Sequence, residues 1–457
     1  MPIELSPAVV ADALARLGEH DLDAAPDVEG ALAWIAGREN AEVPVVISRH
    51  DLQLFLWDQL PRKWLIPLDE KRAVAARLGR FLELVGGRAG DRYAGICTSE
   101  ETMRLLRAWE GDEPGAGEML RAALASSGIE PPDTDALEWG SVMGLEEARL
   151  RDDVALELER ALEEGQLGLE ERSFERRQAG FVADWLRRPR PDRDGRAPID
   201  LISEERLAYW ASQGSDERQA LLAAVLPLLR KPEPAEAASP ASGAPEPLTW
   251  LLDAASGGIA LTQTGALNRA LVRAAAERFP DWWNAELHGS PHREDDVYSL
   301  CEVHKLARRL RLLRRSSRKL FLTRQGERLR LDPAGLFHLC ASRLIAAEGF
   351  EAAAQELAAA VLMSGQTVDR DGLESVVHAA IVADGWTAGG EPPAVYEVAA
   401  AAAGLLRLTE ALGLVEYDYE YDGESGTARR ELNPTAAGRE GLRRALRWRG
   451  LQPARSL

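Results

Sequence analysis

The sequence contains only three cysteines, Cys97, Cys301 and Cys340, and nowhere a run of about 18 apolar residues that could cross a membrane. So few cysteines cannot form a disulfide framework, and their number fits a reducing compartment. The N-terminal residues lack the basic and apolar regions of a signal peptide. Frequent Ala, Arg and Glu with scarce Lys is typical of a high-GC bacterial genome. We therefore expect a cytoplasmic bacterial protein without membrane contact.

Sequence patterns of common enzymes are also missing. The chain has no phosphate-binding loop, no G-x-S-x-G turn, no H-E-x-x-H pair and no Gly-rich dinucleotide turn after a strand. Four residues invite a zinc interpretation, but their spacing does not match known zinc sites. They are Cys301, His304, His338 and Cys340. We expect no catalytic residues, metal or cofactor, and an enzyme is only the third alternative.

Charge is distributed unevenly along the chain. The whole protein carries a formal net charge of −19, which argues against general affinity for nucleic acid. From Glu302 to Arg330, however, eleven Lys or Arg and two Glu give a local charge of +9. Any contact with nucleic acid should therefore come from this segment.

Composition and periodicity predict a mainly α protein: a helical N-terminal region, then tandem winged-helix-like modules with short β-hairpins. Residues 1–230 read as one or two helical bundles, with a weak break near 187–200 where prolines interrupt the helices. Residues 231–248 are rich in Pro and Ala and read as a linker. A basic module is expected at 249–345. A helical segment with a second, acidic module is expected at 346–457.

The basic module is the most informative segment, because residues 297–330 read as a helix followed by a hairpin. Leu300, Val303, Ala307 and Leu310 recur at the spacing of one buried helix face. In a winged helix, such a helix can enter the major groove while the hairpin contacts phosphate. The candidate nucleic-acid-binding residues lie on the other face of the helix and at the hairpin turn: Lys305, Arg308, Arg309, Arg311, Arg314, Arg315, Arg318 and Lys319.

The second module carries charge of the opposite sign. Acids alternate along its first strand, which would repel a duplex: Glu416, Asp418, Glu420, Asp422 and Glu424. The segments LFLTRQGERL (320–329) and RELNPTAAGRE (430–440) both place a Thr and then a Gly before a new helix. This repetition predicts two copies of one unit, and packing or dimerisation is the natural role of the second.

Two segments resemble an uncharacterised group of helical proteins from high-GC bacteria. One is LFLWDQLPRKWLIPLDEKRAVAARLGRFLELVG at 54–86, with its Leu-Pro-Arg-Lys centre. The other runs from LTQTGALNRALVRAAAERFPDWW to EDDVYSLCEVHKLARRLRLLRRSSRKLFLTRQGERL, within 261–329. Some members of that group carry a domain of the plasmid-borne, transposon-passenger type, which this sequence lacks. The resemblance implies a helical protein with a winged module and transfers no catalytic residue.

The leading hypothesis is a non-enzymatic DNA-associated regulator that contacts double-stranded DNA through residues 297–330. The alternative is a protein-interaction scaffold, in which the basic surface meets an acidic protein partner or the acidic helices near 157–171 of this chain. Nothing in the sequence indicates the oligomeric state, the DNA target or the role of residues 1–230.

Overall fold

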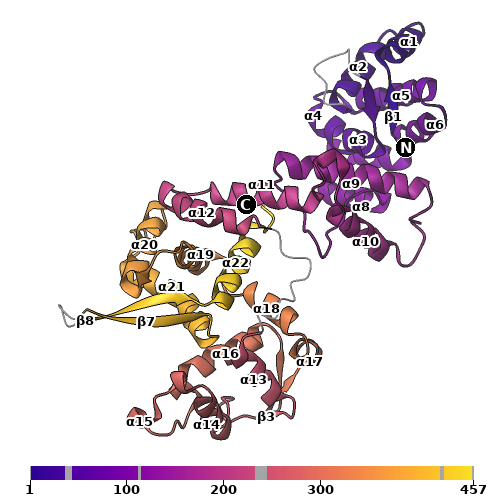
Figure 1. The fold of residues 1–457 in the computed structure, drawn as a ribbon. Coiled ribbons are helices and arrows are strands. Elements are labelled where there is room, and N and C mark those ends of the chain that lie inside the picture. Colours follow the sequence, from indigo (N-terminus) through magenta and orange to yellow (C-terminus); the bar gives the residue numbers. More distant parts are fainter. Residues whose placement is uncertain (1, 36–43, 112–114, 232–243, 423–426, 455–457) are drawn as a thin grey trace. The chain divides into compact units, whose positions relative to one another are not determined.

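The structure is a computed structural model that describes residues 2–35, 44–111, 115–231, 244–422 and 427–454 (Figure 1). Of residues 419–422 and 427–429 only the backbone is described. The described chain is mainly α-helical, with small antiparallel sheets, so the predicted fold class of a mainly α protein with short hairpins is confirmed. None of its described helices has the length and apolar character needed to span a membrane.

The chain divides into two compact units, residues 1–202 with 453–457, and residues 203–452. The boundary falls within helix α11 (Pro198–Ala211). The N-terminal unit contains two hydrophobic cores, one from residues 3–124 and one from 129–202. Its two short strands are antiparallel. Its elements are β1 (Ile3–Leu5), α1 (Pro7–Gly18), α2 (Ala24–Ile35), β2 (Val45–Ile47), α3 (Arg49–Leu54), the π-helix η1 (Phe55–Gln59), α4 (Leu60–Lys63), α5 (Leu68–Val85), α6 (Gly87–Cys97), α7 (Glu100–Glu110), α8 (Ala116–Ser127), α9 (Leu145–Glu163), α10 (Phe174–Arg187) and the 3-10 helix η2 (Pro191–Arg193).

A buried histidine lies between α3 and α9 in the N-terminal unit. His50 is 2% exposed, neither ring nitrogen has a hydrogen-bond partner, and its Nε2 lies 4.0 Å from Asp152 Oδ1. Burial lowers the pKa of His50 to about 4, and the positive charge of Arg151 adds to this effect. Burial and the nearby Asp51 raise the pKa of Asp152 to about 6.

His50 in the unfolded chain becomes protonated as the pH falls below about 6.5, because its pKa there has the ordinary value. In the folded chain the pKa of His50 is lower, so the unfolded chain binds more protons over this pH range. The free energy of unfolding should therefore fall by about 3 kcal/mol between about pH 6.5 and pH 4 on account of His50 alone. Asp152 acts in the opposite direction, so the effect is best measured as the difference between wild type and His50→Leu in urea unfolding. A difference that does not change with pH would contradict a buried neutral His50.

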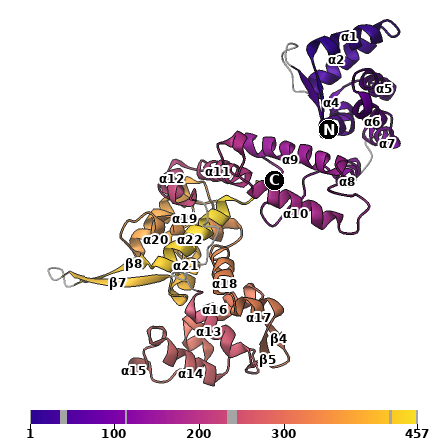
Figure 2. The ribbon, with the colours of Figure 1, turned by 45° about the vertical axis from the view of Figure 1, so that its right-hand side comes forward.

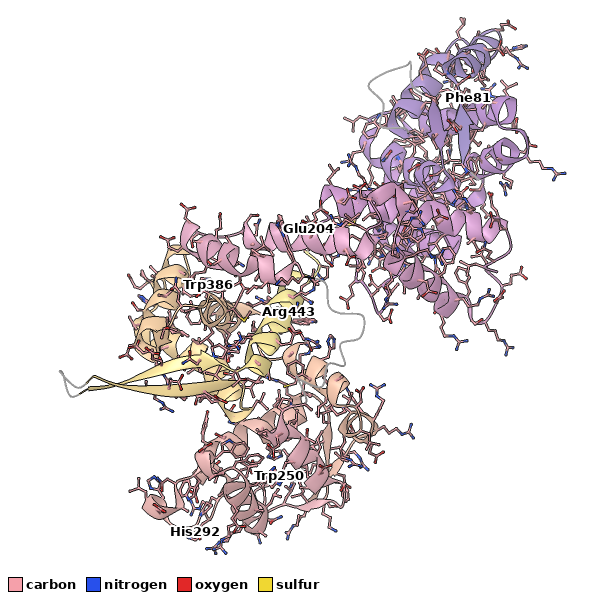
Figure 3. The ribbon with its side chains drawn as sticks, in the orientation of Figure 1. Phe81, Glu204, Trp250, His292, Trp386 and Arg443 are labelled. Atoms are coloured by element: carbon pink, nitrogen blue, oxygen red, sulfur yellow. The ribbon has the colours of Figure 1, made fainter. Side chains whose placement is uncertain are left out.

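The C-terminal unit has one continuous hydrophobic core. Trp250 and Trp386 pack against it from half-buried positions (Figure 3). Its elements are α12 (Asp216–Leu229), α13 (Glu246–Ala255), β3 (Ile259–Ala260), α14 (Arg269–Arg278), η4 (Pro280–Trp282), α15 (Ala285–His288), η5 (Glu294–Asp296), α16 (Tyr298–Arg309), β4 (Leu313–Ser316), β5 (Lys319–Leu322), α17 (Arg324–Arg330), α18 (Pro333–Ala341), α19 (Gly349–Met363), β6 (Val368–Asp369), α20 (Arg370–Ala383), α21 (Val395–Ala411), β7 (Val415–Asp422), β8 (Thr427–Pro434) and α22 (Ala436–Gly450).

Core packing places the division of the chain earlier than the sequence analysis did. Residues of α11 and α12, such as Leu207 and Leu222, share their core with the C-terminal unit, although the sequence analysis grouped 203–230 with the N-terminal region. Along the sequence, the first N-terminal core ends at residue 124 and the second begins at 129. The predicted break near 187–200 lies within the second core. Residues 232–243 of the predicted linker lie outside the described residues, and α13 already includes 246–248.

Two segments of the C-terminal unit repeat one topology. We call residues 246–330 the first module and 349–434 the second module. Each has the order helix, strand, helix, helix, strand, strand; the first module has further short helices between α14 and α16 and also includes α17 after its last strand. Each forms a three-stranded antiparallel sheet in which the last strand of the module is central, in the orders β3-β5-β4 and β6-β8-β7. The first module lies beside the second within this unit (Figures 1 and 2).

The end of each hairpin has the same local geometry in both modules. Thr323 Oγ1 accepts a hydrogen bond of 3.0 Å from the Gly326 backbone N–H, and Thr435 Oγ1 accepts one of 3.0 Å from Gly438. Each threonine therefore caps the helix that follows its hairpin. The Thr and Gly that the two sequence segments share thus serve the same purpose.

Glycine is required at both positions because the helix approaches the preceding backbone closely. A Cβ atom on Gly326 would lie 2.2 Å from the Leu312 carbonyl oxygen, and one on Gly438 would lie 1.7 Å from the Leu414 carbonyl oxygen. These two leucines are also equivalent, since each accepts a backbone hydrogen bond from the capping threonine. The modules thus share contacts as well as element order.

Candidate nucleic-acid interface

The inner face of α16 packs on the core of the first module, as its periodicity predicted. Leu300, Val303 and Ala307 are fully buried, and Leu310, just past the helix, is 5% exposed. A buried pair also anchors the helix: His304 Nδ1 lies 2.7 Å from Glu294 Oε1, while Glu294 Oε2 accepts a 2.6 Å hydrogen bond from the Leu267 backbone N–H. This pair fixes α16 to the segment before α14.

The outer face of α16 is turned toward the second module. α16 packs against α21, and the Arg407 guanidinium of α21 lies 5.7 Å from the centre of the Tyr298 ring. One turn further along α16, the Glu302 side chain is only 16% exposed. Arg309, at the end of the helix, donates a 2.8 Å hydrogen bond to the Arg343 carbonyl. These contacts occupy part of this face: Glu302 is largely covered, whereas Tyr298, Lys305, Arg308 and Arg309 remain exposed.

This packing separates cations that the sequence analysis placed on a single free face. Lys305 donates a 2.9 Å hydrogen bond to Glu302 and lies 5.8 Å from the Tyr298 ring centre, so its charge is partly compensated. Arg309 is held by a carbonyl, and its partial burial lowers its pKa. Arg308 is exposed, and Arg311 lies beyond the end of the helix. Of the four cations predicted near α16, Arg308 and Arg311 are the two whose side chains have no ion-pair partner among the residues that the structure describes.

The hairpin β4–β5 presents the remaining predicted residues. Leu313, Leu320 and Leu322 face the core, whereas Arg314, Arg315, Arg318 and Lys319 are exposed. Ser316 pairs with Lys319, so Ser317 and Arg318 form a two-residue loop. Arg314 lies over the Phe321 ring at 5.7 Å, and Arg315 Nε donates a 3.1 Å hydrogen bond to the Ser317 carbonyl.

Two further exposed arginines follow on α17, beyond the residues chosen from the sequence. Arg324 and Arg328 are one helical turn apart, and no described carboxylate pairs with either. Arg330 differs, because it forms a 3.0 Å ion pair with Asp253. The sequence had placed Arg324 and Arg328 just after the hairpin, and the structure extends the exposed charge onto α17.

We define the basic surface as the exposed cations between residues 308 and 328 that have no ion-pair partner among the described residues, leaving out Arg309, which is bound to the Arg343 carbonyl. Its members are Arg308, Arg311, Arg314, Arg315, Arg318, Lys319, Arg324 and Arg328. Elsewhere in the chain many arginines are paired with acids, such as Arg77 with Asp21 at 2.9 Å and Arg193 with Glu146 at 2.8 Å. The basic surface is therefore a concentration of uncompensated positive charge in an acidic protein.

Arg311 has an unusual backbone conformation. Its φ of +55° lies in the left-handed region, which costs a residue with a side chain about 1 kcal/mol. The equivalent position of the second module is Gly413, with a φ of +67°. Equivalence follows from the next residue: the Leu312 and Leu414 backbone N–H groups bond back to Ala307 and Thr409.

The cysteines and histidines considered for zinc are not assembled into a site. Cys340 is buried in the core, and this burial raises the pKa of its thiol to about 12. His304 is bound to Glu294, whereas His338 is exposed. Over the described ranges, no three His, Cys, Asp or Glu side chains are placed to hold a metal ion.

The first strand of the second module's hairpin carries acids, whereas the hairpin of the first module carries cations. Val415 is buried and Tyr417 packs against the core, whereas Glu416 and Asp418 are exposed, as the alternation predicted. The side chains of Glu420 and Asp422 are not described, and Glu424 lies outside the described residues. The two hairpins therefore share a topology and differ in charge.

Comparison with known proteins gives a match over the first module only. Residues 247–335 match the family model of the Y4jL N-terminal domain. No curated protein and no solved structure matches the chain. The matched range begins in α13 and ends in α18, so it contains all residues of the basic surface.

Proposed function

We propose that this chain is a non-enzymatic DNA-binding protein whose first module is a winged helix that contacts duplex phosphates. Three features of that module support the proposal. It has the element and strand order of a winged helix, its hairpin occupies the position of the wing, and its exposed cations gather on that hairpin and its flanks. The second module has the same topology with an acidic hairpin, and we assign it a packing role.

The main support for DNA binding is that the cations of the basic surface have no acidic partner among the described residues. Like charges held close together on a folded surface repel one another, which destabilises the fold unless something compensates them. In this chain many acids compensate other arginines, yet those of the basic surface have no ion-pair partner among the described residues. A polyanion such as duplex DNA would supply that compensation and release its own counterions.

The test is a fluorescence-anisotropy titration of the full chain with a random-sequence duplex at several salt concentrations. If about five phosphates are neutralised, log Kd should rise with log salt with a slope of about 4 to 5. The variant Arg314→Glu/Arg315→Glu/Arg318→Glu should weaken binding about a hundredfold or more at low salt. Absence of duplex binding by the wild type at low salt would contradict the proposal.

A matched control separates local charge from net charge. Arg149, Arg172 and Arg176 are exposed arginines of the N-terminal unit without ion-pair partners among the described residues. Their joint replacement by Glu changes the net charge as much as the hairpin variant does. If this control weakens binding as strongly as the hairpin variant, the effect is one of overall charge and the assigned surface is wrong.

The rival hypothesis, docking onto acidic helices of this chain, is less well supported. Acids named for that role have partners within their own unit: Glu157 pairs with Arg160 at 2.8 Å and Glu163 with Arg92 at 2.6 Å. A separate acidic protein is the remaining form of this alternative. It would give a stoichiometric complex that duplex DNA does not compete with.

Arg311 provides an independent prediction with opposite effects on folding and binding. Arg311→Gly should raise the free energy of unfolding by up to about 1 kcal/mol, because glycine adopts the left-handed conformation without strain. The same change should weaken duplex binding about threefold to tenfold, because one phosphate contact is lost. Arg311→Ala is the control: it should lose the same affinity without the gain in stability. Unchanged affinity in both variants would remove Arg311 from the interface.

A further inference from the structure

We propose that the first module holds duplex DNA from the side of its β4–β5 hairpin and α17, with Arg318 in the minor groove, and that α16 does not enter the major groove. This inference rests on the proposed DNA binding and specifies its geometry. It differs from the sequence-based expectation, in which the helix enters the major groove and the hairpin only assists.

α16 is a wide element compared with the groove that it would have to enter. An α-helix with its side chains is about 10 to 12 Å across, which nearly fills a major groove about 12 Å wide. Helices that pack together have axes about 8 to 10 Å apart, so a packed pair is too wide for one groove. α16 is packed against α21, with Tyr298 against Arg407 and Glu302 mostly covered. This packing restricts the face that α16 could present to a groove to the side of Lys305 and Arg308.

The charges on α16 support the same conclusion. Lys305 is bound to Glu302, and Arg309 to the Arg343 carbonyl. Among the exposed cations within the helix, only Arg308 has neither an ion-pair nor a carbonyl partner in the described part of the chain. A helix that reads base edges usually presents several free polar side chains to the groove, and α16 presents few.

The end of the hairpin, by contrast, is exposed and narrow. Its two-residue loop consists of Ser317, with a φ of +54°, and Arg318. The minor groove is about 6 Å wide, too narrow for two strands but wide enough for one arginine side chain. Arg318 is exposed in that loop, and Lys319 follows it at the start of β5. An arginine at a hairpin tip with cations behind it suits a groove bordered by phosphates.

The cations that flank the hairpin extend this surface along the DNA. Arg314 lies on the strand face shared with Phe321, and Arg324 and Arg328 follow on α17. Arg311 lies at the base of the hairpin. These residues would contact phosphates on either side of the loop. Arg318 would bind more tightly where the minor groove is narrow. We therefore expect a preference for A-tracts, whose minor groove is narrow and more negative.

The experiment combines groove-specific competitors with variants of the full chain. The probes are an A-tract duplex and a G·C-rich duplex of equal length, with netropsin as minor-groove competitor and methyl green as major-groove competitor. Netropsin should displace the protein from the A-tract duplex and methyl green should not. Lys305→Ala on α16, outside the basic surface, should change affinity by less than about threefold, whereas Arg318→Ala should weaken it about tenfold or more.

Arg318→Lys is the control for charge. It keeps the phosphate attraction, but the more strongly hydrated ammonium should lose most of the preference for the A-tract. Displacement by methyl green, together with loss of binding in the α16 variant, would overturn this inference and leave the proposed function standing. Failure of the wild type to bind either duplex would overturn both.

Discussion

Replacing Glu356 by alanine should lower the free energy of unfolding of the C-terminal unit by about 3 to 5 kcal/mol. Glu356 lies on α19 and is 3% exposed. Its carboxylate accepts hydrogen bonds from Arg218 at 2.7 Å, from Arg449 at 3.0 Å and from the Trp210 indole at 3.2 Å. Without this carboxylate, Arg449 loses its ion-pair partner and Arg218 keeps only the more distant Asp384 at 3.8 Å. These largely buried guanidinium groups cannot be rehydrated without opening the core.

The measurement is urea unfolding of the full chain, with hydrogen exchange on α19 and α22 to locate the loss. Glu374→Ala serves as the control, because its pair with Arg370 is a neighbouring-turn contact at 2.9 Å near the surface of α20. That change should cost no more than about 1 kcal/mol. If Glu356→Ala costs as little as the control, the buried network does not connect α11, α12, α19 and α22 energetically.

Gly438→Ala is expected to cost at least about 4 kcal/mol, which few single substitutions do. Its Cβ would lie 1.7 Å from the Leu414 carbonyl oxygen and 2.7 Å from the carbonyl carbon. These are backbone atoms that connect α21 to β7, so no side-chain rotation can relieve the overlap. The start of α22 would have to move away from the hairpin, and the Thr435 cap would be lost.

Gly441→Ala in the same helix is the matched control. Its Cβ would meet the side chains of Leu344, Leu414 and Phe337 at 3.6 to 3.7 Å, which is ordinary contact. Because alanine favours the helix by up to about 1 kcal/mol over glycine, this variant should be neutral or more stable. Gly326→Ala should repeat the effect of Gly438→Ala in the first module. Equal stabilities of the 438 and 441 variants in urea unfolding would contradict the close approach.

Local features of this fold could be predicted from the sequence because they depend on neighbouring residues. The inner face of α16 follows from the spacing of Leu300, Val303 and Ala307, which brings them to one side of a helix. The two hairpins follow from short strand patterns beside turn residues. The repeated Thr and Gly at 323–326 and 435–438 indicated one unit used twice, since a capping hydroxyl and a close backbone approach need those residue types.

The boundary between the units could not be predicted in the same way. The Pro/Ala-rich segment was the strongest compositional break, yet Leu207 and Leu222 before it pack in the same core as residues after it. Composition shows where a chain cannot form a core. It does not show with which distant segment an amphipathic helix will bury its apolar face.

For the candidate site, the residues that carry the charge and their exposure on the hairpin could be predicted from the sequence, because both follow from residue type and short-range periodicity. How much of that charge lacks a partner depends on packing between distant segments. Tyr298 meets Arg407 and Arg309 meets the Arg343 carbonyl through packing between segments far apart in the chain. Helical periodicity identifies an outward face but contains no information about the distant helix that covers it. For that reason the sequence pointed to α16, whereas the structure directs attention to the hairpin and α17.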